Sequence, residues 1–204
     1  MKRGRAIWIL GGALAITACG AGSDAAGSGI SNASAFEGIY QLTAASENTT
    51  GCDTPGASKL AQLRDQFFVV TSSEIFGQRY LTLNSCSSVA DCQAKRAAQL
   101  AHQPYLVEYG FTLSSSTNAT TLNGIAPSTG AGEGTLCVRR TYSDHVLTVA
   151  ADRRLHLESR TKHLADQPQN DGFCEVDPAK SKQEAASKEC SSLEVFDGSF
   201  IQAN

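Results

Sequence analysis

Seven cysteines give this chain its clearest chemistry, and six of them stand where a folded domain would lie. In an exported protein, an even number of cysteines favours disulfide bonds. Zinc binding is the alternative, but the chain has no C-x-x-C and no cysteine–histidine cluster with ligand spacing. Six cysteines can pair in many ways, and the sequence alone does not choose among them. We favour the pairing in which Cys86 and Cys92 close a tight loop and Cys52 and Cys190 join the start of the domain to its end. The expected bonds are Cys86–Cys92, Cys137–Cys174 and Cys52–Cys190.

Histidines and acidic residues form two further groups that invite a metal-binding interpretation. Neither group has the spacing that zinc or calcium sites use, so we expect exposed histidines and a solvated acidic loop. The residues concerned are His145, His156 and His163 in the first group, and Asp171, Glu175 and Asp177 in the second.

Ser143, Asp144 and His145 contain the three residue types of a hydrolytic triad. Consecutive residues do not converge on one point, because a triad is assembled from separate segments. We therefore expect turn residues here. No nucleophile elbow, His-Glu-x-x-His helix or phosphate-binding loop is present, and we expect no catalytic residue, metal or cofactor.

The first 20 residues have the layout of an export signal. Lys2, Arg3 and Arg5 precede an apolar run over residues 6–18, which is shorter than the ~20 residues that a membrane-spanning helix needs. The run ends in Ile16-Thr17-Ala18-Cys19, which resembles the lipobox of bacterial lipoproteins. That resemblance implies cleavage before Cys19 and acylation of Cys19. An ordinary exported protein with an incidental cysteine is the alternative.

The charge of the remaining chain excludes some partners. Without Lys2, Arg3 and Arg5, the chain keeps 14 of its 17 basic residues and all 20 acidic residues, which gives a formal net charge of −6. Such a chain lacks the basic surface that nucleic acid or anionic lipid requires. Membrane attachment must then come from acyl chains on Cys19. Gly20 is not the aspartate that often marks inner-membrane retention in that family, so the resemblance favours the outer membrane. The periplasmic or surface face stays open.

The chain divides into the signal (1–18), Cys19 with a flexible Gly/Ser/Ala tether (19–35), and one disulfide-stabilised domain (36–204). Alternating apolar residues and turn signals predict many short strands and two or three helices. Helices are expected over 58–65, 88–102 and 177–190. Strands are expected over 36–43, 67–71, 75–84, 105–113, 121–125, 134–142, 146–150 and 155–161, with a strand or hairpin over 193–202.

This pattern predicts a mainly β domain, an antiparallel barrel or sandwich with accessory helices. A lipocalin-like barrel is the leading architecture, because Gly38-Ile39-Tyr40 resembles the Gly-x-Trp with which lipocalins begin, although Tyr replaces Trp. An open α+β antiparallel sheet is the alternative.

Three functions are compatible with the predicted β domain and the resemblance to bacterial lipoproteins. The first is a non-enzymatic, membrane-anchored domain that binds a small apolar ligand or an envelope partner. The second is a structural lipoprotein that docks to an envelope complex through an exposed apolar patch or free strand edge. The third is a hydrolase with a dispersed site. Inward aromatic residues would line a ligand site, or simply form the core: Tyr40, Phe68, Tyr109 and Phe111.

Overall fold

Eight antiparallel strands follow one another around a nearly closed barrel. The computed structural model describes residues 33–75, 78–101, 108–113, 121–129, 132–174 and 176–203. Within them, each long strand but one pairs with the next along the chain, and the last pairs with the first, as in an up-and-down barrel. The strands are β1 (Gly38–Asn48), β3 (Phe67–Ile75), β4 (Gln78–Cys86), β5 (Tyr109–Thr112), β6 (Thr121–Ser128), β9 (Thr141–Val149), β10 (Leu155–His163) and β12 (Ser192–Gln202).

The barrel has one seam, between β5 and β6. No ladder joins these two strands in the described residues. They nevertheless lie close together, because a Cβ on Gly124 of β6 would overlap the carbonyl oxygen of Gly110 in β5 and lie 2.9 Å from Cδ1 of Phe111. Gly124 therefore lets the two edges meet, and the expected barrel is confirmed.

The alternation of strand side chains builds the core inside the barrel. In β10, Leu155, Leu157 and Ser159 are buried, while His156 and Glu158 face outward. An irregularity in β1 between Leu42 and Ala44 changes which residues face inward. The main apolar cluster then runs through all eight strands, from Tyr40 in β1 to Phe196 in β12.

The barrel has two chemically different ends. At one end, the β9–β10 turn meets the start of β1 and the end of β12, and Arg153 places its guanidinium 3.5 Å from the ring centre of Phe200. The hydroxyl of Tyr40 donates to the carbonyl of Phe36 there, at 2.7 Å. A short 3-10 helix, η1 (Ala33–Ala35), packs against this end of the core, so the folded domain includes residues upstream of the expected start at Phe36.

The other end carries the Cys52–Cys190 bond and a small lobe. Here β1 ends, β12 begins, and a connecting segment with β2 (Ala57–Ser58) and η2 (Leu60–Gln62) covers apolar residues of the core. The lobe is a three-stranded sheet of β7 (Gly132–Glu133), β8 (Leu136–Cys137) and β11 (Gln167–Pro168).

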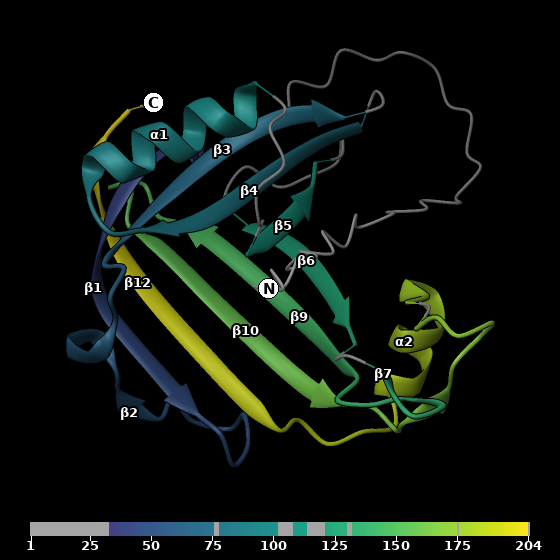
Figure 1. The fold of residues 1–204 in the computed structure, drawn as a ribbon. Coiled ribbons are helices and arrows are strands. Elements are labelled where there is room, and N and C mark those ends of the chain that lie inside the picture. The colour runs from purple at the N-terminus through teal and green to yellow at the C-terminus, as the bar shows by residue number, and fades with distance from the viewer. Residues whose placement is uncertain are drawn as a thin grey trace, which may run out of the picture.

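Two helices lie on the outside of the barrel, as Figure 1 shows. α1 (Val89–Leu100) packs against β3 and β4, where Val69 and Cys92 share a small apolar cluster. α2 (Pro178–Ala185) packs Ala185 against Tyr142 of β9. No helix in the described part of the chain is both long and apolar enough to cross a membrane.

Local sequence explains where both helices begin. Ser88 accepts a hydrogen bond from the backbone N–H of Asp91, and the Asp91 carboxylate accepts one from the N–H of Ser87. Asp177 accepts from the N–H groups of Ala179 and Lys180. With Pro178 in the first turn, Asp177 is the expected N-cap.

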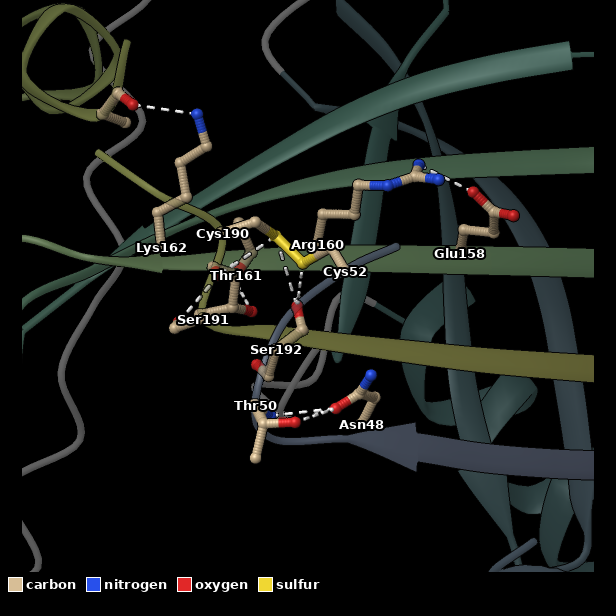
Figure 2. The surroundings of a disulfide bond; sticks show 12 residues. Asn48, Thr50, Cys52, Glu158, Arg160, Thr161, Lys162, Cys190, Ser191 and Ser192 are labelled. Atoms are coloured by element: carbon tan, nitrogen blue, oxygen red, sulfur yellow. Dashed lines mark hydrogen bonds and ion pairs between the residues drawn. A yellow bond between two sulfur atoms is a disulfide. The ribbon is translucent and has the colours of Figure 1, made fainter. Parts of the chain in front are cut away.

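The three disulfide bonds are those that the sequence favours. Cys52–Cys190, Cys86–Cys92 and Cys137–Cys174 join Cα atoms 5.8, 5.2 and 5.5 Å apart. Figure 2 shows the first bond beside Thr161 and Ser191, where the Ser191 N–H and hydroxyl both donate to the Thr161 carbonyl at 2.8 Å. The Cys52–Cys190 bond joins the segment after β1 to the segment before β12, next to the Thr161 carbonyl of β10.

Three expected elements are wrong in detail. The strand over 134–142 is interrupted, because Gly134 and Arg139 have positive φ angles of 61° and 52°, and β9 begins only at Thr141. The helix expected to reach Cys190 ends at Ala185. The helix expected over 58–65 is only the single turn of η2.

Candidate functional site

A row of inward-facing positions crosses the barrel near the Cys52–Cys190 bond. Strand register aligns Gly124 with His145, His145 with Ser159, Ser159 with Glu194, and Glu194 with Glu47. The next row along contains Ser143 and Thr161, whose hydroxyl oxygens are 2.7 Å apart. We call this part of the interior the polar end, defined by Ser143, His145, Ser159, Thr161 and Glu194.

His145 is the central residue of the polar end. Its side chain is buried, at 4% exposure, and Nδ1 lies 3.0 Å from the Ser159 hydroxyl. The other ring nitrogen, Nε2, is buried and has no hydrogen-bond partner among the residues that the structure describes. Burial lowers the pKa of His145, an effect that the carboxylates of Asp144 and Glu194 oppose in part. The imidazole is therefore neutral near pH 7.

Aromatic rings surround this imidazole. Tyr109 meets it edge to face, with ring centres 5.0 Å apart and planes at 86°. Phe111 lies beyond, with ring centres 6.5 Å apart. Tyr109 also contacts Phe196 at 6.4 Å. The imidazole of His145 therefore lies between the polar side chains of the polar end and the aromatic rings of Tyr109, Phe111 and Phe196.

A partly exposed charged group lies on the solvent side of His145. Lys59 Nζ is 2.6 Å from Glu194 Oε1 and 3.3 Å from Glu47 Oε2. It also lies 5.1 Å from the ring centre of Phe196. The Lys59 side chain is 17% exposed, against 32% for Glu194 and 42% for Glu47. The charged group is therefore the most accessible part of the row.

Electrostatics couple the charged group to Tyr109. The Tyr109 hydroxyl donates to Glu194 at 3.4 Å. Burial first, and then the negative fields of Glu194, Glu108 and Glu47, raise the pKa of Tyr109 far above its ordinary value. Burial alone would lower the pKa of Lys59, but its hydrogen bonds to Glu194 and Glu47 outweigh that effect and raise it. Tyr109 stays neutral and Lys59 stays charged at pH 7.

All four aromatic residues named as possible pocket lining lie in the barrel interior. Tyr40, Phe68 and Phe111 are at most 2% exposed, and Tyr109 is partly buried against the core. Tyr40 packs edge to face on Phe200 at 5.7 Å, and Phe68 packs on Phe196 at 5.4 Å. Tyr109 and Phe111 contact His145 at the polar end, whereas Tyr40 belongs to the opposite end. Their role in lining a ligand site stays a prediction.

The expectation for the histidines is wrong for His145. It was expected on the surface and next to a turn, but residues 143–145 lie within β9, and His145 faces the core with Leu147. The alternation His145-x-Leu147-x-Val149 is the signal that places it inside. His163 is exposed.

His156 faces the outside of the barrel, as expected. Its Nδ1 is 2.7 Å from Asp197 and its Nε2 is 3.4 Å from Glu158. Burial alone would lower the pKa of His156, but these two carboxylates outweigh burial and raise it. In the described part of the chain, no three His, Cys, Asp or Glu residues are grouped so that they could hold a metal ion.

The Ser159–His145 pair has the contact of a nucleophile and its base. Ser159 is 3% exposed, and among the described residues no carboxylate bonds the second ring nitrogen of His145. The contact with Ser159 orients the imidazole. Cys19, Glu175 and the first part of the tether lie outside the described residues, so their predicted roles stay predictions.

Comparison with protein-family models, curated proteins and solved structures found no match to this chain.

Proposed function

We propose that this protein is a non-enzymatic binding domain, tethered to the outer membrane of a bacterial envelope by acylated Cys19. Its barrel binds a small ligand with an apolar body and a polar group, and the polar group lies at the polar end. The lipobox-like residues 16–19 support the proposed lipid anchor. The polar and aromatic residues of the barrel interior support the proposed ligand binding.

The unpartnered Nε2 of His145 is the observation that carries this proposal. A buried polar atom without a hydrogen-bond partner costs about 1–3 kcal/mol of folding free energy. A ligand group that hydrogen-bonds Nε2 recovers that free energy. Small-molecule sites typically combine an apolar lining with a few such placed polar groups. Tyr109, Phe111 and Phe196 supply the apolar lining around His145.

A ligand would reach His145 from solvent by passing the charged group of Lys59, Glu47 and Glu194. Glu47 and Glu194 are partly exposed, Lys59 is more buried, and His145 lies deepest. The cover over this route is the segment around η2, whose Leu60 and Leu63 contact the core. The segment is held by the Lys59 ion pairs and by the Lys59 N–H, which donates to the Ala45 carbonyl at 2.8 Å.

A comparison of intact masses tests the proposal. The mature chain from Gly20 onward is exported to the periplasm with a cleavable signal, purified without detergent, and weighed under native and denaturing conditions. A native mass excess that disappears on denaturation, together with its loss in His145→Phe, is the expected result. Equal masses, and no shift of the wild-type melting temperature with apolar extracts of the envelope, would contradict the proposal.

A docking role is the second candidate, and the small lobe favours it. Phe173 is 75% exposed, and Leu136 and Val176 are 43% and 38% exposed. The Cys137–Cys174 bond fixes the backbone next to Phe173. Exposed apolar groups on a rigid frame are typical of protein contacts. Phe173→Ser should weaken co-purification with an envelope protein if this surface docks, and Ile201→Ser, an exposed change elsewhere, should not.

A further inference from the structure

We infer that the ligand of the polar end is a cationic amphiphile, a primary ammonium on an apolar body, and that Lys59 occupies the ammonium position in the free protein. This inference rests on the proposed binding function and names the class of ligand. It is carried by the contacts of the Lys59 ammonium and by the charges around them.

The Lys59 ammonium has the surroundings of a bound cation. It donates hydrogen bonds to two carboxylates, to Glu194 at 2.6 Å and to Glu47 at 3.3 Å. The face of Phe196 lies 5.1 Å below it. Carboxylates and an aromatic face are the groups that recognise ammonium ligands. Both carboxylates and the ring come from barrel strands β1 and β12, so the cation position is part of the barrel itself.

Lys59 reaches this position from outside the barrel strands. It lies between β2 and η2, in the segment that connects β1 to β3. Its long side chain can withdraw toward solvent while its backbone keeps the bond to Ala45. An external ammonium could then take the same contacts without any change in the barrel.

The charge balance favours a cation over an anion. The negative fields of Glu47, Glu108 and Glu194 all act on Tyr109, and those of Asp144 and Glu194 act on His145. Lys59 pairs with two of these carboxylates, those of Glu47 and Glu194. An anionic head group would meet repulsion here, whereas an ammonium would be attracted.

His145 and the rings favour an apolar body behind the ammonium. When Nδ1–H donates to Ser159, the Nε2 of His145 is an acceptor that suits an N–H donor of the ligand. Phe196, Tyr109 and Phe111 form the apolar surroundings next to it. A primary ammonium has three N–H donors, which are enough for both carboxylates and for Nε2, and the alkyl or aromatic body of the ligand lies against the rings.

Calorimetric titration of the mature chain with decylamine, decanoate and decanol, all below their micellar concentrations, tests the inference. Lys59→Met removes the internal competitor, so decylamine should bind about tenfold more tightly than to the wild type. Glu194→Gln removes the main acceptor and should weaken decylamine at least about tenfold. Lys162→Met is the matched control, because Lys162 points outward and donates to Ala185 of α2 at 2.9 Å.

The outcomes distinguish a wrong ligand class from a wrong binding function. Decanoate binding that weakens in Lys59→Met would mean that Lys59 recognises an anion, and would overturn the inference while the binding function stands. Equal affinities for all three probes in all variants would also overturn it. Failure of every probe to bind the wild type and Lys59→Met would overturn the binding function itself. Lys59→Gln, which keeps a polar side chain, replaces Lys59→Met if the latter does not fold.

Discussion

Nδ1 of His145 lies 3.0 Å from the hydroxyl of Ser159, directly across the β9–β10 pair. This contact holds a neutral imidazole inside the barrel with its Nε2 unpartnered. The neighbouring charged group of Lys59, Glu47 and Glu194 makes this end chemically distinct from the end that contains Tyr40 and Arg153.

Protonation of His145 should destabilise the fold. Its folded pKa is lowered, so the unfolded chain binds the proton more tightly, and stability falls as pH drops below the ordinary histidine value of about 6.5. Urea midpoints of the wild type should therefore decrease between pH 7.5 and pH 5 by more than those of His145→Gln. An equal decrease in both proteins would show that His145 titrates as it does in the unfolded chain.

His156 should have the opposite pH dependence. Its folded pKa is raised by Asp197 and Glu158, so its contribution is fully present below about pH 6.5 and is lost as pH rises through the folded pKa. His156→Gln should lower stability at pH 5.5 by a fraction of ~1 kcal/mol, because the pair is partly exposed. The difference should shrink at pH 8.5. A difference that grows with pH would contradict the ion pairs.

Gly124→Val should destabilise the barrel at its seam. A Cβ on Gly124 would overlap the Gly110 carbonyl and crowd Phe111, so β5 and β6 would have to separate. We expect a loss of about 1–3 kcal/mol in urea unfolding. Gly51→Ala is the control, because no atom lies within 4 Å of its added Cβ. If both variants unfold at the wild-type midpoint, β5 and β6 do not meet as described.

The Cys52–Cys190 bond should contribute more stability than the Cys86–Cys92 bond. The two bonds have sequence separations of 138 and 6 residues. The chain-entropy model then gives about 5 and about 2 kcal/mol. Replacing each pair by two serines and comparing unfolding free energies checks this order. Free thiols in the unfolded, non-reduced protein would count against the oxidised state altogether.

Cys19→Ser should release the protein from the membrane fraction. The sequence Ile16-Thr17-Ala18-Cys19 motivates this hypothesis, because acylation requires the thiol of Cys19. Thr17→Ala keeps a small residue at that position and should stay with the membrane. Fractionation followed by immunoblotting measures both. Membrane pelleting of Cys19→Ser would refute the anchor.

The sequence predicted the barrel because its signals are local. Alternation in Leu155-x-Leu157 and the turn at 151–154 define the β9–β10 hairpin without knowledge of the rest. Chain position favoured the disulfide pairing that the structure contains, although the sequence did not exclude the other pairings. His145 was misplaced because Ser143 and Asp144 favour turns, and β9 starts five residues before the predicted strand. Pairing with β10 extends the strand across these polar residues.

The contacts of Lys59 with Glu47 and Glu194 could not be predicted from the sequence, for a different reason. Lys59 lies on a connecting segment, and Glu194 is 135 residues away along the chain. Their contact depends on the closure of β12 onto β1 and on the path of that segment over the core. No local periodicity encodes such a contact, so only the folded chain reveals it.

The ring nitrogens of His145 give the most direct test of ligand binding at the polar end. Long-range ¹H–¹⁵N spectra of the mature chain should be recorded during titration with decylamine, decanoate and decanol. If the barrel binds at this end, at least one probe shifts the Nε2 signal of His145 in a saturable way, and the His156 signals on the outer face stay fixed. An unchanged His145 signal with every probe, at concentrations where the His156 signals respond, would contradict ligand binding at the polar end.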